Sequence, residues 1–389
     1  MNITNKYLVE ALVFLSYMLF AMAWVGGAAS MEQIMLAMKV DSLASASFIS
    51  GMVTVAKIVG TFGAAWLAVK LGVKYAFLVS SVLIAIGIFT PMSPNYEWLL
   101  LSRFLMGLGG AFMIVYFNPI VMQFFTVEER PAINGLNAVA FNVGTAIILW
   151  FMSDINVLTG GWKESLIMFS VMSFVLAAIW LLVKFNVKQT SGSSSESAVT
   201  YSYWQGLKDK FNWIYGLTYA GLLTFYICLF TFYPQAGISQ SKWVIGFGII
   251  GTFAGIIYSK KFPKRVPIIR WSGLMITLTI VGLSFSSSAT IQMISAMLLG
   301  FFIFLPVTAL VSIPHELPNM TTARITVIFS LFYSISYLFS TVLLWLFGKM
   351  VDMNNGDFTQ SFVLIAIVST TFFIGSFFLP ETAKQQGES

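Results

Sequence analysis

Long apolar segments follow one another along this chain, and short polar segments separate them. A helix needs ~20 apolar residues to cross the hydrocarbon core of a bilayer, and each segment must be helical because unpaired backbone cannot face lipid. The pattern predicts an all-α integral membrane fold with twelve transmembrane helices, at residues 8–36, 44–69, 75–92, 98–122, 134–152, 163–184, 211–233, 242–258, 268–286, 289–312, 324–348 and 359–379.

A short basic turn occurs twice, each time directly after an apolar segment. Lys70 and Lys74 flank the first copy, and Lys261 and Arg265 flank the second, so the copies are 191 residues apart (261 − 70 and 265 − 74). A Ser-rich segment, typical of a flexible linker, follows the sixth predicted helix. Such duplication is the pattern of transporters that move two bundles around a central site. The expected parts are an N-terminal six-helix bundle (1–187), a cytoplasmic linker (188–207) and a C-terminal six-helix bundle (208–389).

The distribution of Lys and Arg residues predicts the orientation of these helices. If residue 1 is cytoplasmic, the outer loops hold only Lys39, Lys163, Lys242 and Lys349, and the other basic loop residues face the cytoplasm. By the positive-inside rule both termini are then cytoplasmic. The first segment is too long for a secretory signal and is expected to stay in the membrane. We expect a multi-pass protein of the cell (inner or plasma) membrane, monomeric within the lipid bilayer.

The composition excludes several classes of function. With 58% hydrophobic and 9% charged residues, the chain has more apolar surface than a water-soluble core could bury, which excludes a soluble multidomain enzyme. The net charge of +6 does not indicate nucleic acid, because the basic residues stand singly or in pairs. The single Cys228 and the single His315, which we place in a loop, offer no metal-ligand spacing and no catalytic triad. We expect no enzyme activity, no cofactor and no metal.

The first basic turn carries part of a motif known from a transporter family. In the stretch AWLAVKLGVK, Lys70, Gly72 and Lys74 match the second Gly and the two basic positions of that motif. Ala65 and Val69 stand where the motif has its first Gly and its Asp. The usual charge latch of this turn therefore lacks its carboxylate here.

The fourth predicted helix carries a second motif. Its residues 103–110, RFLMGLGG, are similar to an arginine-plus-glycine motif of the same family. With its twelve helices, its duplication and its linker, the chain resembles the major facilitator superfamily (MFS) over essentially its whole length. The resemblance implies the MFS fold, alternating access and a coupling role for the arginine. It also implies a conformational hinge at Lys70, Gly72, Lys74, Lys261 and Arg265.

No motif resolves the subfamily. The fifth predicted helix lacks the proline of the Gly-Pro-rich signature that drug–proton antiporters carry. The chain is loosely similar to anion and organic acid porters of the superfamily.

Lys57 lies near the middle of the second predicted helix, about 12 residues from Val69, or roughly 18 Å along the helix. A charge at this depth costs ~2.5 to 3.5 kcal/mol and needs a reason. In one interpretation, Lys57 pairs with a buried carboxylate or with helix carbonyls and only holds the bundle together. In the other, it faces a central cavity and attracts an anion.

Arg103 and Glu32 are the other charged candidates. Arg103 shares a helix face with Gly107 and Gly110, so a neighbouring helix can approach closely and confine the guanidinium to the bundle. It either contacts an anionic substrate or serves as a structural element. Glu32 follows Gly26 and Gly27 and is the candidate for proton coupling, although it lies so far along its helix that it can also reach the outer headgroup layer.

Tyrosine and asparagine side chains complete the expected site. Tyr219 and Tyr226 are seven residues apart and share a helix face, as Tyr333 and Tyr337 do at a spacing of four. Such residues either pack against neighbouring helices or line a cavity with hydroxyl groups. Asn118, Asn137 and Asn142 either bond substrate or join helices. The expected substrate-binding set is Lys57, Arg103, Tyr116, Asn142, Tyr219, Tyr226 and Tyr333.

These features predict a secondary active transporter that moves a small organic anion or zwitterion, coupled to protons, by symport. An alternative is a proton-driven efflux pump for hydrophobic drugs or lipid-like amphiphiles, which the many Met and Phe residues favour. A polytopic membrane enzyme or sensor is a third hypothesis, and it would need a catalytic cluster or a soluble output domain.

Overall fold

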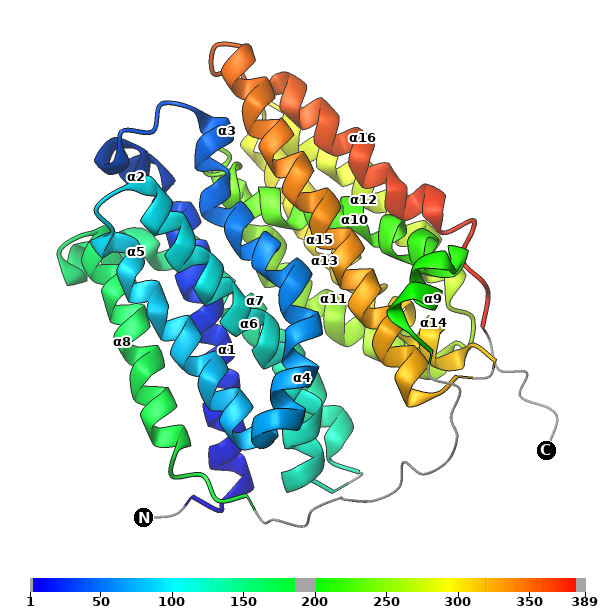
Figure 1. Ribbon diagram of the computed structural model, residues 1–389. Helices are drawn as coiled ribbons and strands as arrows, with labels where there is room; N and C mark the ends of the chain where they lie inside the picture. The colour runs from blue at the N-terminus through cyan, green and yellow to red at the C-terminus, as the bar shows by residue number, and fades with distance from the viewer. Residues whose placement is uncertain (1–2, 127, 186–200, 319, 383–389) are drawn as a thin grey trace.

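The computed structural model describes residues 3–126, 128–185, 201–318 and 320–382, and it is built from helices (Figure 1). The first half holds α1 (Lys6–Ala29), α2 (Met31–Met38), α3 (Leu43–Ala46), α4 (Phe48–Ala85), the 3-10 helix η1 (Ile86–Ile88), α5 (Phe89–Met92), α6 (Tyr96–Phe124), α7 (Arg130–Thr159) and α8 (Trp162–Trp180). The second half holds α9 (Tyr203–Lys208), α10 (Lys210–Thr231), the 3-10 helix η2 (Ser239–Ser241), α11 (Lys242–Lys261), α12 (Val266–Phe285), α13 (Ala289–Phe304), α14 (Val307–Glu316), α15 (Thr322–Met353) and α16 (Thr359–Gly375).

The helices form two groups that lie side by side. In Figure 1, α1–α8 make up the group on the left and α9–α16 the group on the right, and the long helices of both run between the same two ends of the molecule. Within the described residues, ten helical segments are long and apolar enough to cross a membrane. Two shorter apolar helices, Phe48–Ala64 and Thr359–Gly375, accompany them.

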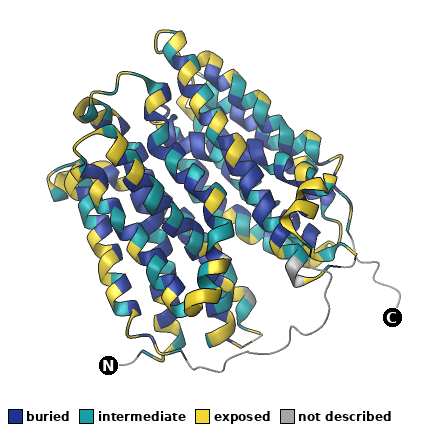
Figure 2. Cartoon of the chain, viewed as in Figure 1, coloured by how far each residue is buried: buried dark blue, intermediate teal, exposed yellow. Residues whose placement is uncertain are grey.

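Burial follows the contacts between helices. Figure 2 shows buried residues where helices meet and exposed residues on the outward faces. Many large apolar side chains on those outward faces are exposed, as expected of helices whose solvent is lipid. Examples are Phe151, Phe174, Ile257, Leu278 and Ile367.

Glycines set the closest helix contacts in the first half. A Cβ atom at Gly107 of α6 would lie 2.9 Å from the Val53 Cα of α4, and one at Gly110 would lie 2.1 Å from the Phe20 ring of α1. A side chain at either position would therefore push the helices apart. This close packing leaves Arg103, on the same face of α6, 1% exposed.

Two predicted helices are interrupted in the structure, and one predicted turn is confirmed. The predicted helix 8–36 is two helices, because α1 ends at Ala29 and α2 begins at Met31. The predicted helices 44–69 and 75–92 are separated by a turn at Gly72, as expected, and its φ of 77° is a conformation that glycine adopts without strain. The predicted helix 289–312 is divided at Pro306, where the missing N–H removes a helix hydrogen bond.

The predicted loop at His315 differs from the structure, and the predicted linker is described only in part. Residues 188–200 of the linker lie outside the described residues, and its last residues belong to α9, which begins with a capping box between Ser202 and Gln205. His315 lies in the last turn of α14 instead of a loop, and it is exposed.

Candidate functional site

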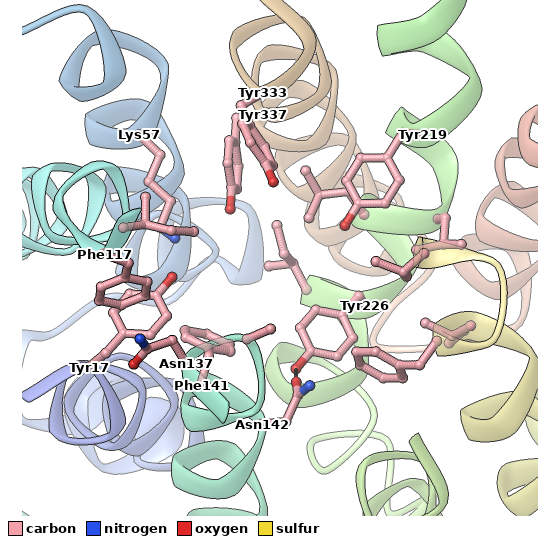
Figure 3. A pocket seen from close by; sticks show the side chains of 18 of the residues that line it. Tyr17, Lys57, Phe117, Asn137, Phe141, Asn142, Tyr219, Tyr226, Tyr333 and Tyr337 are labelled. Carbon is pink, nitrogen blue, oxygen red and sulfur yellow. Dashed lines mark hydrogen bonds between the residues drawn. The ribbon is translucent and has the colours of Figure 1, made fainter. Parts of the chain in front are cut away.

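A cavity of about 430 Å³ lies between the two groups of helices. Its walls come from α1, α4, α6 and α7 on one side and from α10, α13, α14 and α15 on the other. Figure 3 shows the side chains that converge there. Such a volume is in the range of sites for small organic molecules.

Lys57 reaches this cavity from α4. Its side chain is 4% exposed and contributes to the cavity wall, and Figure 3 shows its amine pointing inward. The nitrogen lies over four aromatic rings, at 5.2 Å from Phe20, 5.1 Å from Trp24, 5.6 Å from Phe141 and 5.3 Å from Tyr337. The first three rings belong to the first half and Tyr337 to the second, so the ammonium lies where the halves meet.

The charge of Lys57 has no carboxylate partner among the described residues. The ion pairs found there are Lys6–Glu129, Arg265–Glu316 and Arg324–Asp209, and no Asp or Glu residue lines the cavity. Aromatic faces stabilise a cation by about 0.5–2 kcal/mol each. Ring faces carry no formal negative charge, so no carboxylate among the described residues compensates the Lys57 amine when it is protonated.

Hydroxyl and amide groups line the rest of the cavity. Tyr219, Tyr226 and Tyr333 line it from the second half and Asn142 from the first, and their predicted contact with substrate stays a prediction. The Tyr226 hydroxyl donates a hydrogen bond to the Asn142 Oδ1, 2.7 Å away, and thus joins the two halves (Figure 3). Asn137 also lines the cavity.

Tyr17, Trp24 and Phe141 were missed by the sequence reasoning, although all three line the cavity. Tyr17 and Trp24 are seven residues apart on α1 and so share one face. Their spacing could have indicated a shared cavity face. However, 16% of the residues are aromatic, and most aromatic pairs at this spacing simply pack against neighbouring helices.

Arg103 lies away from the cavity and binds backbone. Its Nε donates to the Ile49 carbonyl, and its two terminal nitrogens donate to the Ala23 and Trp24 carbonyls, all at 2.8 Å. The guanidinium therefore clamps α6 to α1 and α4, and its predicted contact with substrate stays untested. Tyr116 also lies outside the cavity wall, and its hydroxyl donates to the Ala64 carbonyl at 2.8 Å.

Glu32 lies in the first turn of α2 and is exposed, outside the cavity. The helix α1 ends at Ala29, so Glu32 belongs to the separate helix α2. Its predicted role in proton coupling stays untested and has no support from its surroundings.

The predicted hinge residues lie at the turns after the first part of α4 and after α11. Lys74 donates to the Leu181 carbonyl at 3.0 Å, and Lys70 lies 4.8 Å from the Trp66 ring. Arg265 pairs with Glu316 at 2.7 Å. Lys261 lies 6.0 Å from the Phe262 ring. These contacts stay within one half each.

An ion pair between Lys6 and Glu129 joins the first residue of α1 to the residue before α7. Lys6 donates to Glu129 at 2.5 Å, and this hydrogen bond holds the pKa of the Glu129 carboxyl below its usual value. Both side chains are about one-third exposed, so the pair adds little to stability.

Sequence comparison identifies the family. Residues 13–341 match the family described as Major Facilitator Superfamily. The chain belongs to this superfamily. Its members are transporters, so its helices are transmembrane and its function is transport of small molecules rather than enzyme catalysis.

Other proteins share parts of the sequence. An uncharacterized protein of Campylobacter jejuni is 28% identical over 269 residues, which cover 65% of this chain and 82% of that protein. Solute carrier family 22 member 2 of Mus musculus is 33% identical over 100 residues, which cover 25% of this chain and 18% of that protein.

Solved structures share the fold over nearly the whole chain. The inward-open xylose transporter XylE from E. coli has a TM-score of 0.78 at 13% identity and covers 98% of both chains. A bacterial homologue of the human lysosomal transporter Spinster, inward-facing and unoccupied, has a TM-score of 0.75 at 15% identity, covering 96% of this chain and 97% of that one. The transporter FucP in its outward conformation has a TM-score of 0.65 at 16% identity, covering 97% of this chain and 100% of that one.

Proposed function

We propose that this protein is a proton-coupled secondary transporter that moves a small organic anion or zwitterion through the cavity between its halves. One observation carries the proposal: the Lys57 ammonium lies in the cavity with aromatic rings and without a carboxylate partner among the described residues. An unpaired buried cation is costly, and a bound carboxylate or phosphate would neutralise it. Lys57 is then the anion anchor.

The remaining walls suit the organic part of such a substrate. Trp24, Phe141 and Phe304 offer apolar surface, and the hydroxyls of Tyr219 and Tyr333 offer hydrogen bonds. A zwitterion would place its carboxylate at Lys57 and its ammonium against ring faces on the opposite wall. The same carboxylate would have to displace ring contacts of Lys57, so substrate binding would loosen the junction between the halves.

The proposed topology follows the sequence pattern and the fold of the superfamily. The ten long apolar segments and the two shorter apolar helices would together make twelve spans, six on each side of a linker at 188–207. With both termini cytoplasmic, the protein would lie in the inner or plasma membrane as a monomer and act by symport. The cavity would face the cytoplasm in this state, as an alternating-access transporter requires in one of its two conformations.

The experiment is a thermal-shift and uptake screen of the purified protein with a panel of small mono- and dicarboxylates. We expect one or more of these anions to stabilise the wild type, and Lys57→Ala to weaken that binding by about tenfold or more, since charge-assisted bonds stabilise by ~1.5–3 kcal/mol. Lys163→Ala is the control, because Lys163 is exposed and lies over Trp162 outside the cavity. Equal anion affinity in wild type and Lys57→Ala would remove the anchor.

The aromatic walls favour a second candidate, efflux of hydrophobic amphiphiles. The same screen distinguishes the two when amphiphilic cations are added to the panel. Stabilisation by amphiphilic cations that increases in Lys57→Ala would favour the efflux pump, because the mutation removes a repelling charge.

A further inference from the structure

A second buried ionisable group lies close to the cavity, and the proposed mechanism does not yet use it. Glu10 of α1 is 4% exposed, and neither of its carboxylate oxygens accepts a hydrogen bond. Asn137 of α7 is 1% exposed and lines the cavity, and neither its Oδ1 nor its Nδ2 has a hydrogen-bond partner. The Asn137 amide faces the Glu10 carboxyl without reaching hydrogen-bond geometry. Two buried polar groups are thus left unsatisfied beside one another.

Helix periodicity joins Glu10 to the cavity wall. Glu10, Tyr17 and Trp24 are spaced by seven residues, so they lie on one face of α1, with steps of roughly 10 Å. Tyr17 and Trp24 line the cavity. Glu10 therefore continues the same stripe toward the beginning of α1.

The charges near this end of α1 have other partners. The helices α4, α6, α7, α8 and α10 pack against α1, and the ionisable groups that face the cavity from them and from α1 include Lys57, Tyr17 and Tyr226. Lys184 and Lys210 are exposed. The remaining basic groups at this end are Lys6 (paired with Glu129), Lys70 (over the Trp66 ring), Lys74 (bonded to the Leu181 carbonyl) and Arg130 (bonded to the Met122 and Phe125 carbonyls). No cation thus compensates an ionised Glu10 in the part of the chain that is described.

We propose that Glu10 and Asn137 form the proton-binding site of this transporter. Burying an ionised carboxylate without a partner is costly, whereas the protonated carboxyl is neutral and can donate. The carboxylate takes one proton from water, and the new O–H donates to the Asn137 Oδ1 after a small side-chain movement. When the site opens to water the proton leaves, the O–H bond breaks, and the carboxylate is hydrated. The site lies on the cavity stripe and replaces Glu32 as the coupling carboxylate.

The first test needs no substrate. Infrared difference spectra of the reconstituted protein, recorded between acidic and alkaline pH, detect the C=O stretch of a protonated carboxyl group. We expect a band that titrates in the wild type, disappears in Glu10→Gln and returns in Glu10→Asp, which keeps the carboxyl. Glu32→Gln is the matched control and should keep the band. A spectrum unchanged in Glu10→Gln would overturn the proposal.

The second test concerns coupling, and it rests on the proposed function. In proteoliposomes loaded with the anion that stabilises the wild type, Glu10→Gln should retain exchange of that anion across the membrane. It should lose accumulation driven by an imposed pH gradient, by tenfold or more. Gradient-driven uptake that equals the wild type would overturn the coupling role. If the wild type moves none of the anions, the proposed function fails, and the infrared titration still decides whether Glu10 binds a proton.

Discussion

At the scale of single residues, the two buried cations of the first half are stabilised in different ways. Arg103 has three backbone carbonyls at 2.8 Å, so its donors are satisfied within the protein. The Lys57 amine lies over aromatic ring faces and borders the cavity. A guanidinium suits fixed multidentate bonding, whereas a lysine ammonium is a mobile point charge. The geometry thus separates a structural cation from one that is free to meet a ligand.

Gly27 makes room for Arg103 and provides a test of the clamp. A Cβ atom at Gly27 would lie 2.6 Å from one guanidinium nitrogen and 2.8 Å from the Arg103 Cζ. Because three carbonyls hold the guanidinium, it cannot move aside without losing bonds, so Gly27→Ala should destabilise the protein by ~1–3 kcal/mol. The measurement is the Tm in detergent.

Gly135 supplies the control for that substitution. It lies inside α7, and a Cβ atom added there would meet no heavy atom within 4 Å. Gly135→Ala should leave the Tm unchanged or raise it, because alanine is the better helix former by ~0.5–1 kcal/mol. Equal Tm values for both alanine variants would contradict the clamp.

Sequence reasoning could place Lys57 and several tyrosines in a cavity, because depth in a helix and helix periodicity are readable from spacing. The same reasoning could not show that Glu32, Arg103 and Tyr116 lie outside the cavity wall. The break of α1 before Glu32 and the backbone carbonyls that Arg103 and Tyr116 find belong to tertiary structure. Glu10 stands near the start of a predicted helix, where its spacing carries no sign of burial, and only packing against α7 reveals that it is buried.

At the scale of elements, one carboxylate joins the halves at the end where α3 begins. Asp352, near the end of α15, accepts hydrogen bonds from the Ser42 hydroxyl at 2.7 Å and from the Leu43 and Ala44 N–H groups at 2.8 and 2.9 Å. It thus caps the first turn of α3 from the other half, where unpaired N–H groups favour negative charge. A contact of Thr54 with Thr341 at 2.6 Å, further along α4 and α15, adds to this junction.

Asp352→Asn should weaken this junction and favour the state that is open at the α3 end. The amide lacks the negative charge, and charge-assisted bonds are worth ~1.5–3 kcal/mol, where about 1.4 kcal/mol changes an equilibrium tenfold. Spin labels at Leu36→Cys and Met353→Cys, both exposed positions on opposite halves, report the separation when Cys228 is replaced by Ala. We expect a longer distance to gain population.

Asp357→Asn is the matched control for that measurement. Asp357 is also an acidic residue of this end, but it accepts hydrogen bonds from Thr359 in its own half. Its substitution should leave the distance distribution unchanged. A distribution that Asp352→Asn does not alter, or that both variants alter equally, would show that the cap does not hold this end closed.

At the scale of the whole molecule, the apolar segments and the duplication predicted an all-helical membrane protein of this superfamily, and the family match confirms it. Both features depend on composition and on repeated spacing. They remain readable where single motif residues differ, as at Ala65 and Val69, which replace the Gly and the Asp of the motif. The interruptions at Ser30 and Pro306 and the short α9 were not predicted. These features are short, and the residues on both sides of Ser30 and Pro306 are apolar. The hydrophobic pattern alone therefore does not predict them.

The orientation and the open side of the cavity can be tested together with one reporter. Ala138 of α7 lines the cavity and is exposed to it, whereas Leu158, near the end of α7, is 85% exposed. In a Cys228→Ala background, we expect a membrane-impermeant maleimide to label Ala138→Cys in inside-out vesicles and not in intact cells. Leu158→Cys should show the opposite sidedness, because α7 crosses the membrane between the two positions.

Ligand protection then links sidedness to function. A carboxylate bound at Lys57 would occupy the cavity next to position 138, so labelling of Ala138→Cys should slow in its presence and labelling of Leu158→Cys should not. Labelling of Ala138→Cys from the outside alone would reverse the proposed facing of the cavity. Labelling of both cysteines from the same side would contradict the proposed path of α7, since a helical segment of 28 residues is long enough to place its ends on opposite sides of the bilayer.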